Sequence, residues 1–413
     1  MGTMETLMSD QSGIISPAFQ AAQHVSTVLG LRVAPEQLPE DLISLCRREL
    51  TRAEEVNAPR DKWGNWEGPA PRPGAAYHYA FLDRAILAWA SQHGISRRSL
   101  WPDGASWAFC LTHDMDFVCR YARWRETAQA CGRLFRAGGL GRTLRRCGGG
   151  LLRSLGGLRR DPWWCFEKWL EISRAVGAPA TWFVFAERVS HPHKYDAVYS
   201  YSQRVRFDGR RMTVAEMLRE IRAAGNEIGL HPSIHAARDG KALLHQRRQV
   251  EDATQCDVRS VRQHYLRWDA GITSREQAKA ALNVDSTLGF NRGVGFRAGT
   301  CHPFRIIPPG GTPGESIIEV PLQLMDVALF SEDGVHCRTV DDGVSVCMKI
   351  MDEVQAAGGV LTVNWHPNFI TDETTVTVLR ILLEEAQRRR PWFATISQIA
   401  EHWEQQMQNL SVS

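Results

Sequence analysis

The stretch Trp107-Ala108-Phe109-Cys110-Leu111-Thr112-His113-Asp114-Met115-Asp116 sets both the expected fold and the expected chemistry. Its apolar first half predicts a buried strand over 106–111, and two carboxylates stand at the exit of that strand. Residues two apart in an extended segment share a face, so Asp114 and Asp116 are expected side by side. An Asp-rich turn or helix cap is the plainer explanation of such a pair. The chemical one is that one carboxylate binds a cation while the other stays free as a base.

Beyond residue 105, short apolar runs alternate with longer amphipathic stretches. We predict strands over 106–111, 180–186, 226–231, 259–264, 293–297, 316–321 and 360–366, with helices over 163–176, 213–224, 242–256, 272–282, 341–357 and 374–389. Alternation of this kind predicts an α/β fold in which crossover helices join parallel strands, in a sheet that is open or closed into a barrel.

Polar side chains of catalytic type follow several of these strands. The positions are Asp114 and Asp116 after the first strand, His231 after the third, His264 after the fourth, Arg297 after the fifth and His366 after the last. Barrels of alternating strands and helices build their sites from several strand ends at one face. The sequence therefore predicts an enzyme rather than a scattered set of surface residues.

A histidine pair, His231 and His235, follows the third predicted strand. If this segment opens a helix, a spacing of four places both rings on one face, and Pro232 fits the first turn of such a helix. Surface or core histidines are the commoner explanation of this spacing. A zincin motif is excluded because Pro232 stands where that motif needs glutamate. A carboxylate from elsewhere, supplied by Asp114 or Asp116, would complete a metal site.

These motifs resemble the polysaccharide deacetylase family, the metal-dependent carbohydrate esterases of the NodB-homology type. The residues that carry the resemblance are Thr112-His113-Asp114-Met115-Asp116, His231 to His235, Gly295-Phe296-Arg297-Ala298-Gly299 and Leu361-Thr362-Val363-Asn364-Trp365-His366, in the family's order over about 106–400. Arg262-Gln263-His264-Tyr265 and Asp285-Ser286-Thr287-Leu288-Gly289-Phe290 resemble a divergent branch of the family.

The resemblance implies a distorted (β/α) barrel that holds one divalent metal ion, commonly zinc. It implies Asp114 as catalytic base, Arg297 as the residue that orients this base, and His366 as general acid. Asp116, His231 and His235 are the implied metal ligands. Met115 separates two aspartates that are adjacent in the family, so the roles of Asp114 and Asp116 are open to exchange, and Pro232 replaces the family's serine.

Composition narrows the class of protein. The chain has 413 residues, a formal charge of +3 and ten cysteines without a CxxC pair. We therefore expect a soluble cytoplasmic protein with reduced thiols, without a disulfide framework and without a nucleic-acid partner. Residues 1–105 are expected to form an N-terminal extension, and 106–405 the catalytic domain.

The segment 127–160 departs from this pattern, with eight arginines, many glycines and no acidic residue. A solvated insertion loop is the simpler explanation. Four leucines at 151, 152, 155 and 158 are spaced like one apolar helical face beside the arginines, which would suit peripheral contact with an anionic membrane or an acidic glycan.

The leading functional hypothesis is the hydrolytic removal of an acetyl group from an N-acetylated sugar of a polysaccharide or glycan precursor. One alternative is a related amidase that cleaves a non-peptide C–N bond of a small metabolite, because a fold does not fix its substrate. The other is a catalytically silent glycan-binding protein. The presence of Asp114, His231, His235 and His366 argues against the silent version.

Overall fold

The computed structural model describes residues 16–66, 76–120, 161–193, 195–197, 199–307 and 315–412. The basic segment 127–160 lies outside the described residues, so its proposed surface role stays a prediction.

One curled sheet organises the described chain, in the strand order β10-β11-β1-β2-β5-β6-β7-β9-β8, with β12 beside the start of β1. Neighbouring strands run parallel except for β8 and β9, which are antiparallel. The strands are β1 (Ala108–Met115), β2 (Ala180–Val184), β5 (Glu227–Leu230), β6 (Ser260–Val261), β7 (Val284–Asp285), β8 (Phe304–Ile306), β9 (Ile317–Glu319), β10 (Leu324–Met325), β11 (Val360–Asn364) and β12 (Trp392–Phe393). A separate hairpin joins β3 (Arg204–Phe207) to β4 (Arg210–Thr213).

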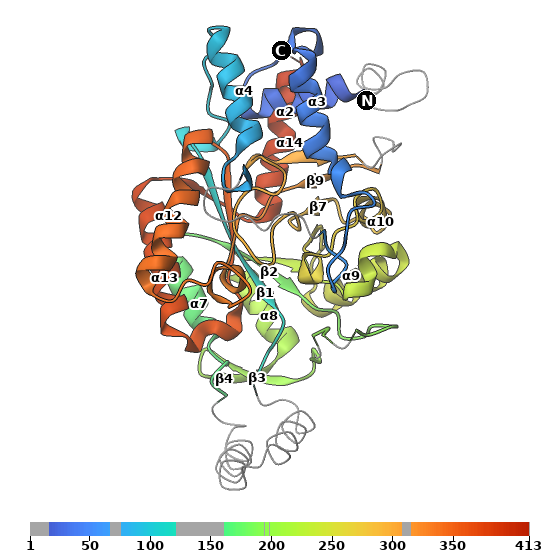
Figure 1. Ribbon diagram of the computed structural model, residues 1–413. Coiled ribbons are helices and arrows are strands. Elements are labelled where there is room, and N and C mark those ends of the chain that lie inside the picture. The colour runs from blue at the N-terminus through green and yellow to red at the C-terminus, as the bar shows by residue number, and fades with distance from the viewer. Residues whose placement is uncertain are drawn as a thin grey trace.

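Helices surround this sheet and extend beyond one end of it (Figure 1). The α-helices are α2 (Pro17–Leu29), α3 (Glu40–Thr51), α4 (Phe81–Gln92), α7 (Phe166–Ala175), α8 (Val214–Ala223), α9 (Gly240–Thr254), α10 (Thr273–Lys279), α11 (Asp326–Phe330), α12 (Val340–Ala357), α13 (Glu373–Arg388) and α14 (Ile396–Val412). Short 3-10 helices include η2 (Ala53–Glu55), η5 (Ile234–Arg238), η6 (His264–Leu266) and η8 (Pro367–Thr371).

Local sequence signals fix several helix ends. Ser16 accepts a hydrogen bond from the amide of Phe19 at the start of α2, where Pro17 fills the first helical position. Thr213 and Glu216 cap each other at the start of α8, as do Thr339 and Asp342 at the start of α12.

The two faces of the sheet carry different cores. Odd-numbered residues of β1, such as Phe109 and Leu111, pack in the large apolar cluster that also holds residues of α7, α8, α9, α12 and α13. Even-numbered residues, such as Ala108 and Cys110, share a second cluster with Trp403 and other residues of α14. This alternation continues to the strand end, where the same face ends in Thr112 and Asp114.

The N-terminal helices α2, α3 and α4 share a third apolar cluster with the later part of the sheet, including Phe304 of β8 and Ile317 of β9. Helix α14 contacts α2, and these four helices lie together at one end of the molecule (Figure 1). The expected boundary near residue 105 stays a prediction, but the helices on its N-terminal side are packed on the sheet rather than separate from it.

The predicted α/β fold, a distorted barrel of strands and helices, is confirmed as a curled, open, mainly parallel sheet. All six predicted helices are present, displaced by at most a few residues. The predicted strand 293–297 is wrong, because this segment is a loop in which Gly295 has φ +124°. A Cβ there would lie 2.3 Å from the carbonyl oxygen of Tyr77, so only glycine allows the N-terminal segment to approach so closely. The short strand β7 fills the position in the sheet instead.

Candidate metal centre

Three side chains converge where β1, β5 and β6 end: Asp116, His231 and His264. Asp116 Oδ1 lies 3.4 Å from His231 Nε2 and 3.7 Å from His264 Nε2, and all three ligand atoms lie within 4.8 Å of one another. Asp116 Oδ1 is buried and has no hydrogen-bond partner among the described residues. A buried carboxylate oxygen facing two imidazole nitrogens is an arrangement that a divalent cation satisfies.

Each histidine is held through its other ring nitrogen. His231 Nδ1 lies 2.7 Å from the carbonyl oxygen of Arg262, which makes Nδ1 the donor and leaves Nε2 as the nitrogen that faces the site. His264 Nδ1 lies 3.4 Å from Oδ1 of Asp196, which also accepts the amide of Ile234. Metal-binding histidines usually have such partners, because these fix the tautomer and the orientation of the ring. The residues fit a metal with two nitrogen ligands and one oxygen ligand, which is typical of zinc.

Asp114 lies beside this cluster and is held differently. Its Oδ1 accepts from the Arg262 guanidinium at 3.1 Å, and its Oδ2 accepts from Asn364 at 2.9 Å and lies 3.9 Å from His231 Nε2. Burial alone would raise the pKa of Asp114, but Arg262 and the nearby imidazoles outweigh burial and lower it. Asp114 is therefore an ionised, oriented carboxylate at the edge of the candidate metal centre.

His366 approaches the centre from the end of β11, and its Nε2 lies 3.8 Å from Asp116 Oδ2. Its Nδ1 is 2.7 Å from Asp326 Oδ1. Burial opposes the charged ring, but Asp326 and the two site aspartates outweigh it and raise the pKa of His366 to about 10. His366 is thus a protonated imidazolium aimed at the site, as a general acid must be. Asp326 was not singled out as a site residue from the sequence.

The predicted metal ligand His235 is not brought to this cluster. Ser233 is extended, with ψ 152°, so the short helix η5 begins only at Ile234 and the helical turn expected from His231 does not form. The imidazole of His235 is exposed and contacts His193, at 5.3 Å between ring centroids. His264 stands where His235 was expected, and its position after the fourth predicted strand was the signal available in the sequence.

Arg297 also lies outside the site, because the strand that would have carried it does not form. It pairs with Glu55, with Nη2 to Oε2 at 2.6 Å, and both side chains are buried. The residue that orients Asp114 is Arg262, which is fully buried and also donates to Thr112 Oγ1 and to Ser286. One indication of this was visible in the sequence, since Arg262 precedes His264 by two residues and shares its side of an extended segment.

The turn that carries His264 is strained and supported from outside the sheet. Tyr265 and Leu266 have positive φ angles of 56° and 49°, which non-glycine residues rarely adopt. The carbonyl oxygen of Tyr265 accepts from the side-chain amides of Asn65 and Asn291, both at 2.7 Å. Trp63 stacks on the Tyr265 ring at 4.3 Å. The N-terminal segment therefore helps to hold a candidate metal ligand in place.

A pocket of about 250 Å³ opens over these residues. Its walls combine the site residues with Phe117, Tyr265, Met325, Val327 and Phe369. Phe117 is 48% exposed and its ring contacts that of Trp163 at 5.4 Å. The volume lies somewhat below the usual range for small-molecule sites, so the pocket suits a small reacting group with an apolar face.

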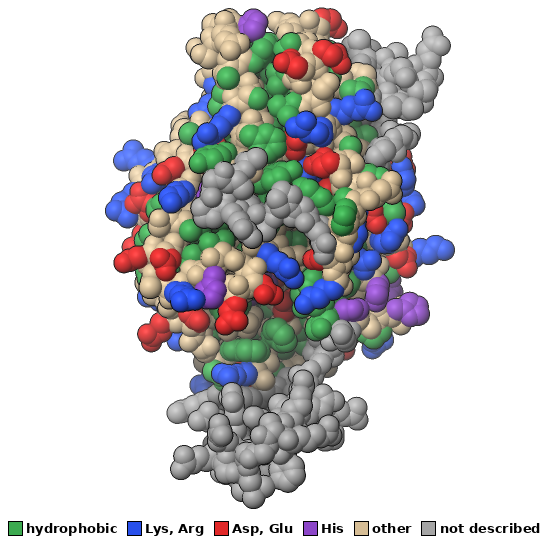
Figure 2. All heavy atoms as spheres, viewed as in Figure 1, with side chains coloured by type: hydrophobic (Ala, Val, Ile, Leu, Met, Phe, Trp, Pro, Cys, Tyr) green, Lys and Arg blue, Asp and Glu red, His purple; other side chains and the backbone are tan. Residues whose placement is uncertain are grey.

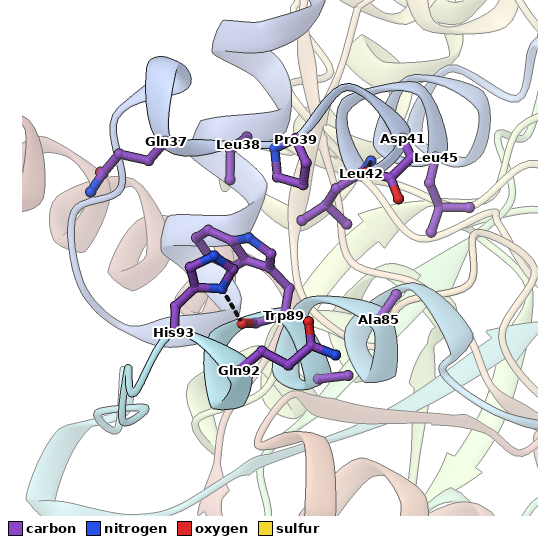
Figure 3. Close-up of a pocket in the computed structure, with 11 residues that line it drawn as sticks. Gln37, Leu38, Pro39, Asp41, Leu42, Leu45, Ala85, Trp89, Gln92 and His93 are labelled. Atoms are coloured by element: carbon purple, nitrogen blue, oxygen red, sulfur yellow. Dashed lines mark hydrogen bonds between the residues drawn. The ribbon is translucent and has the colours of Figure 1, made fainter.

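A larger cavity, of about 590 Å³, lies elsewhere, between α3 and α4 (Figure 3). The imidazole of His93 bonds the carbonyl oxygen of Trp89 there at 2.8 Å, and the other polar side chains are Gln37, Asp41 and Gln92. This cavity has no convergent ligand set, so the smaller pocket is the candidate active site. On the face drawn in Figure 2, acidic and basic side chains are interspersed. None of the described helices is long and apolar enough to cross a membrane.

No protein-family model matches the chain, and no curated protein matches its sequence. Two similar solved structures are provisionally named polysaccharide deacetylases. The one from Mycobacterium smegmatis is 21% identical, with 74% of this chain and 93% of that chain covered and a TM-score of 0.46. The one from Pseudomonas aeruginosa PAO1 is 15% identical, with 76% and 96% covered and a TM-score of 0.47. Puue allantoinase is also similar, at 15% identity, 76% and 95% coverage and a TM-score of 0.47.

Proposed function

We propose that the protein is a metal-dependent hydrolase that removes an acetyl group from an N-acetylated sugar of a polysaccharide or glycan precursor. The observation that carries this proposal is the convergence of Asp116 Oδ1, which has no hydrogen bond among the described residues, with the Nε2 atoms of His231 and His264. We infer that these three side chains hold one divalent ion, most simply zinc.

Such an ion, when bound, polarises the acetyl carbonyl and lowers the pKa of water, which contributes several kcal/mol to transition-state stabilisation. The protein's own groups move the protons. Asp114, kept ionised by Arg262, accepts a proton from the attacking water. His366, held by Asp326, donates a proton to the leaving amine nitrogen through Nε2. A base and an acid that line one pocket are what amide hydrolysis needs.

A second candidate, an amidase for a small metabolite, is favoured by the size of the pocket. About 250 Å³ admits one small ring or one acetamido group rather than a long chain. The exposed aromatic edge formed by Phe117 favours the sugar, because an apolar ring face can stack there. Acetate release from a panel of N-acetylated saccharides, run beside ring-opening of small cyclic amides, distinguishes the two reactions.

The decisive variants are a matched pair of histidines. His264→Gln should lose the bound metal and hydrolytic activity, whereas His235→Gln should keep both, because His235 is exposed and outside the ligand set. Metal content is measured by elemental analysis of the purified full chain. Loss of metal from His235→Gln with retention in His264→Gln would contradict the proposed ligand set.

A further inference from the structure

A second cluster of ligand-type side chains lies where the N-terminal helices meet the sheet. Asp83 from α4 converges there with Cys301 and His302 from the loop before β8, and His24 from α2 lies beside Asp83; we call these four residues the His24 cluster. All four side chains are at most 2% exposed. The carbonyl oxygen of Cys301 accepts the amide of Val360, the first residue of β11, whereas the candidate active site lies beyond the other end of that strand.

The carboxylate of Asp83 is the centre of this cluster. Its Oδ2 lies 3.2 Å from Cys301 Sγ and 3.2 Å from His302 Nδ1, and its Oδ1 lies 3.8 Å from His24 Nε2. A tetrahedral ion with bonds of about 2.0–2.3 Å keeps its ligand atoms roughly 3.3–3.8 Å apart. The separations from Asp83 fall close to that range, and the ligand atoms of Asp83, Cys301 and His302 all lie within 4.8 Å of one another. A shift of side chains would therefore bring these atoms around an ion.

Hydrogen bonding within the protein does not satisfy this cluster. Three buried atoms have no hydrogen-bond partner among the described residues: both ring nitrogens of His24, and Nδ1 of His302. Buried polar atoms of native proteins are nearly always paired, and such exceptions need an explanation. Asp83 itself is well bonded, since it accepts from Thr300 Oγ1 at 2.6 Å and from the amide of Cys301 at 2.9 Å.

The chemical types of these groups match a structural metal. A thiolate, a carboxylate and two neutral imidazoles supply two negative charges, which a divalent cation neutralises inside an apolar surrounding. Thiolate and imidazole together favour zinc over magnesium or calcium, which prefer oxygen ligands. Asp83, Cys301 and His302 already converge, and His24, whose Nε2 lies 3.8 Å from Asp83 Oδ1, is the candidate fourth ligand. Four protein ligands would leave no open position, which is the mark of a structural site rather than a catalytic one.

We propose that His24, Asp83, Cys301 and His302 form a second, structural divalent-metal site, of zinc type, that fastens the N-terminal helices to the barrel. The site joins His24 and Asp83, near the start of the chain, to Cys301 and His302, which are more distant in sequence. The ion would therefore stabilise the packing of α2 and α4 against the sheet. This inference is independent of the proposed hydrolase activity, because the two ligand sets share no residue.

The test is a count of metal ions per chain together with a cobalt spectrum of the full-length protein. We expect two ions in the wild type, one in His264→Gln and one in Cys301→Ser. Cobalt-loaded wild type and His264→Gln should show a thiolate-to-cobalt charge-transfer band, because only the His24 cluster contains a cysteine, and Cys301→Ser should lack this band. Cys347→Ser, another fully buried thiol, is the matched control and should keep both ions and the band.

The wild-type cobalt spectrum does not depend on any variant folding correctly. The proposal would be overturned if the wild type took up cobalt without showing a thiolate band. It would also be overturned if the wild type held only one ion per chain and His264→Gln held none. The wild type could instead hold one ion, show the band, and lose the ion in Cys301→Ser. That result would support the second site and contradict the proposed catalytic metal. Chelator should lower the melting temperature of His264→Gln more than that of Cys301→Ser.

Discussion

Asp326 holds His366 through both of its carboxylate oxygens: Oδ1 lies 2.7 Å from the ring Nδ1, and Oδ2 accepts the backbone amide of His366 at 2.7 Å. The contact fixes both the position and the charge of the imidazole. It also makes Nδ1 the donor to Asp326 and turns Nε2, with the proton that His366 is proposed to donate, towards Asp116.

Asp326→Asn should therefore change the pH dependence of the reaction as well as its rate. Loss of the carboxylate lowers the pKa of His366 from its raised value of about 10, so the alkaline limb of the kcat/KM profile should move to lower pH. We expect kcat to fall about 10- to 100-fold at neutral pH. A rate loss with an unmoved alkaline limb would mean that Asp326 acts on folding only.

The two site aspartates should respond differently to amide substitution. Asp114→Asn should keep the metal content near the wild-type level while lowering kcat by roughly 10²- to 10⁴-fold, because only the base is lost. Asp116→Asn should lose the metal, because Asp116 supplies the carboxylate ligand. Elemental analysis and acetate release, measured on the same samples, check both expectations, and the reverse pattern would exchange the two roles.

Two of the buried arginines, Arg262 and Arg297, form a second contrast. Arg262→Met should lower kcat with metal retained, because Asp114 loses the guanidinium that lowers its pKa. Arg297→Met should instead lower the free energy of unfolding by about 3 kcal/mol, because it leaves part of the buried Glu55 charge uncompensated. Urea unfolding and kcat are measured for each variant. An Arg297→Met protein of normal stability but impaired kcat would return Arg297 to the site.

A buried carboxyl pair predicts how stability depends on pH. Asp285 of β7 and Glu319 of β9 are direct partners in the sheet and are fully buried. Burial raises the pKa of both, and the Asp285 carboxylate raises that of Glu319 further. In an unfolded chain these carboxyl groups have pKa values of about 4. Above that pH the folded state binds more protons than the unfolded state, so the free energy of unfolding falls as the pH rises.

Glu319→Gln should relieve this penalty. The amide can still accept the amide proton of Leu288 through its oxygen, and it can donate to Asp285 without ionising. We expect the variant to be about 1–3 kcal/mol more stable than the wild type at pH 8, with a smaller difference at pH 5. Urea unfolding at both pH values checks this, with the exposed Glu401→Gln as control. An equal gain at both pH values would remove titration as the cause.

Sequence periodicity predicted the parts of the fold that are long and regular. The strand that leads to Asp114 and the helices that cover the sheet have enough residues for a pattern to emerge. The strand β7 has only two residues, too few for any periodicity. The predicted strand over 293–297 took the place of β7, and Arg297 was placed in the site with it.

The structure brings together the predicted site residues whose placement depends on strand order, and it separates those whose placement depends on tertiary contacts. Asp114, Asp116, His231 and His366 meet because parallel strands end at one edge. His235 was misplaced because the backbone stays extended through Ser233 before η5 begins, which the i, i+4 spacing does not reveal. Asp326 reaches His366 across neighbouring strands from 40 residues away in sequence, and no pattern within a short window contains that pairing.

The buried contacts made by Glu55 and Asn65 have a consequence for any attempt to trim or transplant the chain. Glu55 is the partner of Arg297, and Asn65 steadies the strained turn that bears His264. A fragment that starts near residue 105 would leave a guanidinium without its counterion inside an apolar interior and would free a turn that non-glycine residues rarely hold unaided. The segment that carries the candidate site therefore cannot be transplanted by itself. A chimaera that includes this segment must also include the preceding helices.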